Sequence, residues 1–105
     1  MKIYISGPVT GTTDYKERFE AAEKELTDAG YEAVNPIKDK PEGQTWEWYM
    51  KKDLAQMLEC DGLYVLEGWN ESDGASLEVS LACELKMPIQ GAEWGILKKL
   101  MNVSA

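Results

Sequence analysis

The alternation of short β-rich segments with segments of helical period constrains the fold of this chain more than any other feature. The β-rich segments cover residues 2–5, 31–34, 63–66 and 88–90. Apolar residues recur at helical spacing over residues 14–29, 46–60, 74–86 and 94–101. Such alternation is typical of a parallel sheet that carries helices on both faces and is joined by right-handed crossovers. We therefore predict an α/β fold with a parallel sheet of four or five strands.

The length of 105 residues is that of one domain, so we expect residues 1–105 to form a single Rossmann-like or flavodoxin-like three-layer sandwich. In sheets of this kind, ligands bind beyond the carboxyl ends of the strands, where the strand order reverses. The segments predicted to border a site are residues 6–13, 35–45 and 67–75. The pair Asp14 and Glu17 is typical of a helix N-cap.

Composition excludes several classes of function. The chain has no histidine, which excludes Ser-His-Asp hydrolysis, Cys-His proteolysis and histidine-ligated zinc. The 19 acidic and 11 basic residues give a net charge of −8, which argues against a nucleic-acid polymer as partner. Cys60 and Cys83 form no CxxC motif, and we expect both to be reduced and buried in a cytoplasmic protein. No apolar run approaches the length of a membrane span, so no membrane partner is expected.

The loop at residues 6–13 contains two glycines and four hydroxyl side chains. Its backbone N–H groups and the start of the following helix are suited to binding an anion. It matches neither the GxGxxG nor the GxxxxGK[ST] motif, so a tight turn into a capped helix is the alternative interpretation. The candidate binding residues in this loop are Ser6, Gly7, Pro8, Thr10 and Gly11.

Asp53 is a carboxylate on a helix face that is otherwise apolar. It shares a stripe with Trp46 and Met57, where desolvation raises the pKa of an unpaired carboxyl group. The alternative is a boundary residue paired with Lys51, Lys52 or a backbone N–H. Asp53 is therefore a candidate for acid–base chemistry.

Glu78 is the second such carboxylate, near the end of the first turn of the helix predicted over residues 74–86. Its helical neighbours are the inward-facing residues Ala75, Leu81, Ala82 and Leu85. We therefore expect Glu78 to point toward the strand ends, beside Tyr4, and a solvent-facing glutamate is the alternative. Ser72 and Gly74 allow a tight turn into this helix, with Ser72 or Asp73 as its cap. Two carboxylates, a tyrosine and a hydroxyl-rich loop suit glycosidic-bond chemistry, in which one carboxylate attacks the sugar carbon.

Four segments of the chain carry a resemblance to a known family. They are residues 3–8 with Gly11, residues 30–36, Asp53-Leu54 with Asp61, and Ser72-x-Gly74-x-x-x-Glu78 with Ala82. As an ordered set they resemble the nucleoside 2-deoxyribosyltransferase superfamily, which includes the 2'-deoxynucleoside 5'-phosphate N-hydrolases. They are most similar to its short bacterial and phage members. The resemblance spans nearly all of residues 2–90.

The resemblance implies a role for each matching residue. Glu78 matches the nucleophile that attacks C1' and forms a glycosyl-enzyme ester. Asp53 matches a second acid that orients the substrate or protonates the departing base, and Tyr4 matches a tyrosine that hydrogen-bonds the nucleophile. Ser72 matches an acid in the transferases and a serine near the 5'-phosphate in the nucleotide hydrolases. No metal or organic cofactor is implied.

The chain departs from the nucleotide hydrolases in the first loop, where Pro8 and Thr10 replace a serine and an arginine. A 5'-phosphate would have to rest on loop N–H groups, Ser6, Thr10 and either Lys16 or Arg18, the only arginine. The aromatic residues at positions 46, 48 and 49 are predicted either to stack on a base or to belong to the core.

Three functions remain open at this point. The first is cleavage or transfer of the N-glycosidic bond of (deoxy)nucleosides or their 5'-monophosphates. The second is a module that binds or sequesters a nucleotide without turnover, and the third is a small structural domain without a ligand. Members of this family assemble as homodimers or larger homo-oligomers, so the resemblance implies the same here. An apolar set near the C-terminus either forms such an interface or belongs to a helix that covers its own sheet: Trp94, Leu97, Leu100 and Met101.

Overall fold

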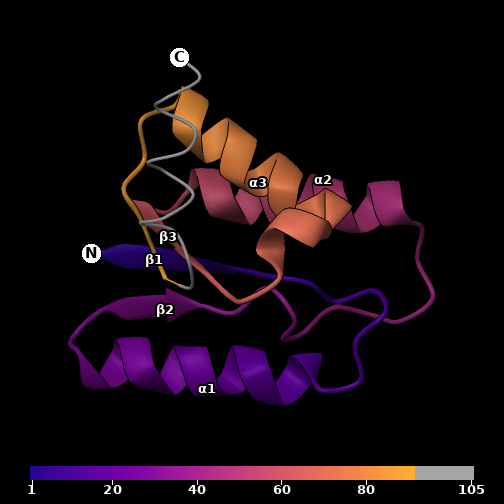
Figure 1. Cartoon of the computed structure of the whole chain (residues 1–105), viewed down its shortest axis with the longest axis horizontal. Helices are drawn as coiled ribbons and strands as arrows, with labels where there is room; N and C mark the ends of the chain where they lie inside the picture. The colour runs from indigo at the N-terminus through magenta and orange to yellow at the C-terminus, as the bar shows by residue number, and fades with distance from the viewer. Residues whose placement is uncertain (92–105) are drawn as a thin grey trace.

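A computed structural model describes residues 1–91 of the chain (Figure 1). Strands and helices alternate along it in the order β1 Lys2–Ser6, α1 Tyr15–Asp28, β2 Glu32–Val34, α2 Trp46–Leu58, β3 Gly62–Val65, the short 3-10 helix η1 Trp69–Glu71, α3 Asp73–Glu84 and β4 Ile89–Gly91. Within residues 1–91 the predicted elements are confirmed, with boundaries that move by at most two residues, and η1 is an addition. The helix predicted over residues 94–101, with the apolar set proposed for oligomerisation, lies outside the described residues.

The four strands form one parallel sheet in the order β2-β1-β3-β4. In its register, Tyr4 of β1 lies opposite Val34 of β2 on one side and Leu63 of β3 on the other. The chain runs from β1 outward to β2 and then crosses back over β1 to β3. The strand order therefore reverses between β1 and β3, which is where α/β sheets of this class bind ligands.

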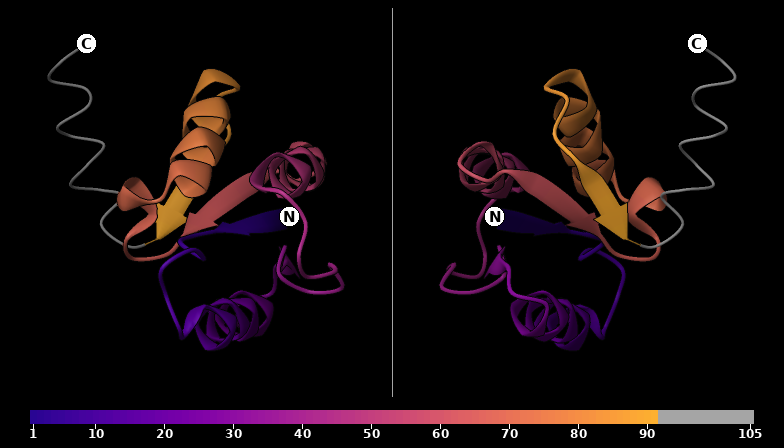
Figure 2. Two further views of the ribbon diagram at one scale, coloured as in Figure 1. Left: turned by 90° about the vertical axis from the view of Figure 1, so that its right-hand side faces the viewer. Right: turned by 90° about the vertical axis from the view of Figure 1, so that its left-hand side faces the viewer.

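Helices cover both faces of the sheet, as Figures 1 and 2 show. Helix α1 lies on one face, and α2 and α3 lie together on the other. Because side chains alternate along a strand, Ile5 packs with Phe19 of α1, whereas Tyr4 packs in the core beneath α2 and α3. The predicted α/β three-layer sandwich is confirmed.

The helix N-termini differ in how they are capped. The hydroxyl oxygens of Thr45 and Ser72 accept hydrogen bonds from the backbone at the starts of α2 and α3. Asp14 is the N-cap residue of α1 and Glu17 lies in its first turn, as expected, but the side chain of Asp14 makes no capping hydrogen bond. Leu85 is also exposed and does not face the core as predicted, because α3 ends at Glu84.

Among residues 1–91, no helix combines the length and the apolar character needed to cross a lipid bilayer.

Candidate active site

A cleft of about 520 Å³ opens at the carboxyl edge of the sheet. Four segments that are distant in sequence line it: residues 7–16 after β1, residues 36–42 after β2, one face of α2, and residues 71–78 around the start of α3. Gly74 brings α3 against α2, because a Cβ at this position would lie 3.1 Å from Sδ of Met50. A glycine is also required at position 7, because a Cβ there would lie 2.8 Å from the Cβ of Leu66.

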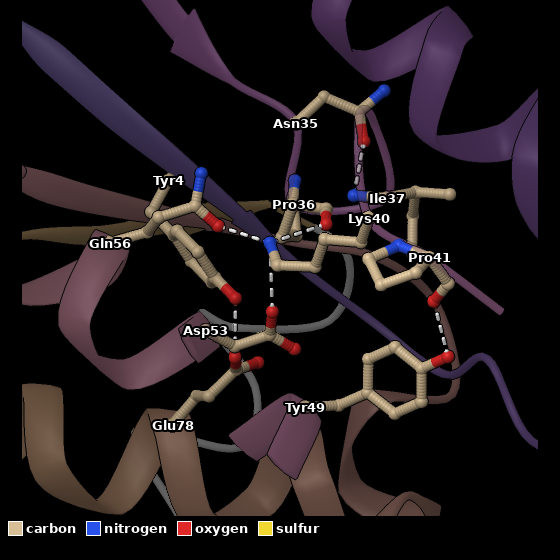
Figure 3. A network of polar contacts seen from close by, with 10 residues as sticks. All are labelled: Tyr4, Asn35, Pro36, Ile37, Lys40, Pro41, Tyr49, Asp53, Gln56 and Glu78. Atoms are coloured by element: carbon tan, nitrogen blue, oxygen red, sulfur yellow. Dashed lines mark hydrogen bonds and ion pairs between the residues drawn. The ribbon is translucent and has the colours of Figure 1, made fainter. Parts of the chain in front are cut away.

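Glu78 is the most deeply buried carboxylate that lines this cleft, with only 4% of the residue exposed. Two hydroxyl groups of β1 hold its two oxygens. The Tyr4 hydroxyl donates to Oε2 at 2.5 Å, and the Ser6 hydroxyl donates to Oε1 at 2.7 Å. Figure 3 shows the contact with Tyr4. Tyr4 and Ser6 are two residues apart on a strand, so both side chains point to the face that α3 covers.

Burial raises the pKa of Glu78 from 4.5 to about 7, although the hydrogen bonds from Tyr4 and Ser6 oppose the shift. The negative charge of Asp53 raises this pKa further, and the positive charge of Lys40 lowers it. Burial also raises the pKa of Tyr4 well above its ordinary value, and the charge of Glu78 adds to that effect. Tyr4 therefore remains a protonated donor at neutral pH.

Asp53 lines the cleft from α2, and its side chain is 21% exposed. Its Oδ1 atom lies 3.1 Å from the ammonium of Lys40, and this ion pair is the one contact of Oδ1 within residues 1–91. Burial raises the pKa of Asp53 above its ordinary value, and the hydrogen bond and charge of Lys40 oppose the rise. The alternative interpretation, a pairing with Lys51, Lys52 or a backbone N–H, names the wrong partner, because the structure pairs Asp53 with Lys40.

Lys40 is the residue of the site that sequence reasoning missed. It comes from the loop between β2 and α2, and its side chain is 13% exposed. Besides Asp53, its ammonium donates to the backbone oxygen of Pro36 at 2.7 Å and to the side-chain oxygen of Gln56 (Figure 3). The loop was correctly expected to border the site, but nothing in its sequence distinguishes Lys40 from Lys38, which pairs with Glu23 on α1.

The predicted binding residues of the first loop divide into two groups. Gly7 and Thr10 line the cleft, whereas Pro8 and Gly11 are not among its lining residues. Ser6 is 1% exposed and is also not a lining residue, because its hydroxyl is used by Glu78.

Two further predicted residues, Ser72 and Gly74, lie at the start of α3 and line the cleft. The hydroxyl oxygen of Ser72 accepts the backbone N–H of Ala75 at 3.3 Å, so it caps the helix as well. Of the two cations considered for a phosphate, Lys16 lines the cleft, while Arg18 donates to the backbone oxygen of Glu67 at 2.6 Å.

The cleft also has an aromatic wall, which α2 provides. Trp46 and Tyr49 of α2 line the cleft, and Trp46 is 48% exposed. The Tyr49 hydroxyl donates to the backbone oxygen of Pro41 at 2.6 Å, which ties the loop after β2 to α2 (Figure 3). Trp48 is not a lining residue, and its ring meets that of Tyr49 edge-on with centroids 5.3 Å apart.

The charges that line the cleft are mainly negative. There are five carboxylates, Glu42, Asp53, Glu71, Asp73 and Glu78, and two lysines, Lys16 and Lys40. Within residues 1–91 there is no group of three or more acidic or cysteine side chains arranged to hold a metal ion. The cleft therefore presents two carboxylates at its base, hydroxyl donors behind one of them and an aromatic wall at its side.

Comparisons with known proteins agree with the fold. A sequence model of the family described as "Domain of unknown function (DUF4406)" matches residues 1–91. Among solved structures, the 2-deoxyribosyltransferase of the psychrotolerant bacterium Bacillus psychrosaccharolyticus is similar with a TM-score of 0.67. The two sequences are 21% identical, and the similarity covers 87% of this chain and 71% of the other. No curated protein matches the sequence. The resemblance inferred from the sequence is confirmed as a nucleoside 2-deoxyribosyltransferase-like fold.

Proposed function

The chain belongs to the DUF4406 family, and from this premise and the cleft we propose that it cleaves the N-glycosidic bond of a nucleoside. The sugar passes to water or to a second base, and a 5'-monophosphate is the alternative substrate form. The observation that carries the proposal is the carboxylate of Glu78, which is buried beside the cleft with each oxygen held by a neutral hydroxyl. In such an environment the hydroxyls orient the carboxylate, and no cation is needed in contact with it.

The proposed reaction has two steps. In the first, an oxygen of Glu78 forms a bond to C1' of the sugar, and the bond from C1' to the base nitrogen breaks. The base leaves with that electron pair and takes up one proton. In the second step, water or another base attacks C1' and gives up one proton to solvent, while the ester bond from C1' to Glu78 breaks and releases the carboxylate. Asp53 lines the cleft beside Glu78, where it orients the substrate or protonates the departing base.

The aromatic wall supports a substrate that carries a flat ring. Trp46 and Tyr49 offer ring surfaces of the kind on which nucleobases stack. The similar structure is described as an enzyme for the synthesis of nucleosides, which supports the same substrate class here. We therefore place the base against α2 and the sugar between Asp53 and Glu78.

The charges of the cleft favour a nucleoside over its 5'-monophosphate. Carboxylates outnumber lysines among the lining residues, and a phosphate would add a further negative charge. The Ser6 hydroxyl and the Lys40 ammonium are already engaged within the protein. Thr10, Lys16 and Ser72 are the side chains of the cleft suited to a phosphate, since the hydroxyl of Ser72 only accepts a hydrogen bond from the backbone.

A substrate panel tests the proposal directly. The protein is incubated with each common ribonucleoside and deoxyribonucleoside and with each 5'-monophosphate, and free base is measured by chromatography. Thermal unfolding is followed with the same compounds. We expect release of base from at least one nucleoside, with weaker turnover of its monophosphate. Stabilisation without release from any compound would support a binding module, and neither effect would support a structural domain.

A further inference from the structure

Lys40 makes three polar contacts inside the protein. Its ammonium donates hydrogen bonds to Pro36 and Gln56 and lies 3.1 Å from Oδ1 of Asp53 in an ion pair. Two of these partners are neutral, so Asp53 is the carboxylate that faces the charge of Lys40. The side chain of Lys40 is 13% exposed, and these contacts hold its ammonium against Asp53. It acts on the site through Asp53.

The ion pair divides the two oxygens of Asp53 between protein and cleft. Oδ1 is buried and faces Lys40, whereas Oδ2 has no partner within residues 1–91. Figure 3 shows Oδ1 turned toward the ammonium and the second oxygen turned away from it. A carboxylate fixed in this way presents one acceptor to the cleft in a constant direction.

We propose that Lys40 is a positioning residue of this site, which keeps Asp53 ionised and oriented so that Asp53 accepts a hydrogen bond from a substrate O–H or N–H group. The inference rests on the proposed function and chooses between the two roles left open for Asp53. Asp53 then orients the substrate, and the proton that the departing base takes up comes from water.

The two carboxylates explain why a cation is needed at this position. Glu78 and Asp53 line the same cleft, and the negative charge of Asp53 disfavours the ionised form of Glu78. Two such groups without a cation share a proton, which would leave the nucleophile or its partner neutral. Lys40 offsets one negative charge and permits both carboxylates to be ionised together.

The other charged and titratable groups near this pair do not replace Lys40. Tyr4 from β1 faces Glu78 as a neutral donor, and Cys60, just after α2, contributes only to the environment of Tyr4. The ammonium of Lys16, the second lysine of the cleft, lies 3.9 Å from Oε1 of Glu42, which also lines the cleft. Glu71 and Asp73 at the start of α3 add negative charge.

The test compares Lys40→Met with Lys38→Met, a matched control in the same loop. Lys38 forms an exposed ion pair with Glu23 and does not line the cleft. The rate of base release is measured as kcat/KM from pH 4 to pH 9. For Lys40→Met, we expect the acid limb of the profile to move to higher pH by about one unit. The reason is that two carboxylates without a neighbouring cation hold a proton more tightly. Lys38→Met keeps the wild-type profile.

A conservative variant separates charge from packing. Lys40→Arg retains the positive charge, and we expect its acid limb to coincide with that of the wild type even where the maximal rate falls. Lys40→Gln, which keeps hydrogen-bonding capacity without charge, serves where Lys40→Met does not fold. An unchanged acid limb in folded Lys40→Met or Lys40→Gln, or an equal upward shift in Lys40→Arg, would overturn the inference.

A second measurement remains valid if no nucleoside is turned over. The side-chain carboxyl carbons are labelled with ¹³C and their chemical shifts are followed by NMR as the pH is lowered. We expect the Asp53 signal to titrate at a higher pH in Lys40→Met than in the wild type and in Lys38→Met. Identical Asp53 titrations refute the inference, whereas absence of base release by the wild-type protein counts against the proposed function alone.

Discussion

Glu78 and Asp53 line the same cleft, but different kinds of group hold their carboxylates. Glu78 is bound by two neutral hydroxyls from β1, while Asp53 is paired with the ammonium of Lys40. Burial raises the pKa of both groups, and that of Glu78 reaches about 7. Only Asp53 has a counter-charge in direct contact. Neutral donors therefore leave Glu78 close to the balance between its two protonation states.

The difference assigns separate tasks to the two carboxylates. A cation bound tightly to a nucleophile would lower its reactivity. Neutral donors orient the nucleophile without this loss of reactivity. A residue that positions a substrate gains from a fixed direction and a constant charge, which an ion pair provides. The predictions below remove one element of this contrast at a time.

Replacement of the proposed nucleophile has the largest expected effect. Glu78→Gln keeps the size of the side chain and one oxygen that accepts from Tyr4 or Ser6, while the other hydroxyl has to turn and accept from the amide N–H, and the amide does not attack C1'. We expect base release to fall by at least about 1,000-fold, measured by chromatography of single-turnover reactions. The circular dichroism spectrum should match that of the wild type. Turnover at a normal rate by this variant would remove Glu78 from the mechanism.

The same variant tests the burial of charge through stability. Between pH 4.5 and pH 7 the folded protein holds a proton at Glu78 that the unfolded chain has released, because folding raises the pKa of Glu78 from 4.5 to about 7. The contribution of Glu78 to the free energy of unfolding therefore falls as pH rises through this window, by about 3 kcal/mol in total. It is smallest above pH 7.

Urea unfolding at a series of pH values measures this loss, with Glu78→Gln as the reference that lacks the titration. We expect the difference in stability between the variant and the wild type to grow in favour of the variant from pH 4.5 to pH 7, and then to level off. A difference that does not change with pH would show that Glu78 has an ordinary pKa in the folded protein.

Replacement of the second carboxylate, Asp53, is expected to lower the free energy of unfolding, where replacement of Glu78 raises it. Asp53→Asn leaves the ammonium of Lys40, whose side chain is 13% exposed, without its counter-charge. We expect a loss of about 2 kcal/mol in the free energy of unfolding at pH 8, between the values typical of exposed and of buried ion pairs. In urea unfolding at pH 8, we therefore expect the free energy of unfolding to decrease in the order Glu78→Gln, wild type, Asp53→Asn. A more stable Asp53→Asn protein would contradict the contrast.

The frame of the site could be predicted from the sequence because periodic patterns encode it. The alternation of strands and helices fixed the edge of the sheet at which the cleft lies, and the apolar neighbours of Glu78 on α3 indicated an inward carboxylate. These inferences depend on the spacing of residues along regular elements, where a position in the sequence determines a direction in space.

The contacts that tune the site could not be predicted in the same way. Lys40 reaches Asp53 from an irregular loop, and no periodicity tells which of its two lysines turns inward. Ser6 was assigned to the first loop, but β1 extends through it and directs its hydroxyl to Glu78. Here a signal was present, since Ser6 lies two residues after Tyr4 and so shares its face of the strand.

The smallest predicted effect concerns the neutral donors, and it asks whether they tune Glu78 or only pack against it. Tyr4→Phe keeps the ring in the core and removes the hydroxyl that donates to Oε2. Since that hydrogen bond lowers the pKa of Glu78, its loss raises the pKa, and the acid limb of kcat/KM moves to higher pH. A hydrogen bond to a charged group contributes about 1.5–3 kcal/mol, so activity at pH 7 should fall by roughly tenfold or more and recover in part at pH 8.5.

Ser6→Ala should act in the same direction with a smaller loss of activity. If Tyr4→Phe lowers the rate equally at every pH, the tyrosine orients the carboxylate without setting its protonation, and the contrast between neutral and charged donors concerns geometry alone.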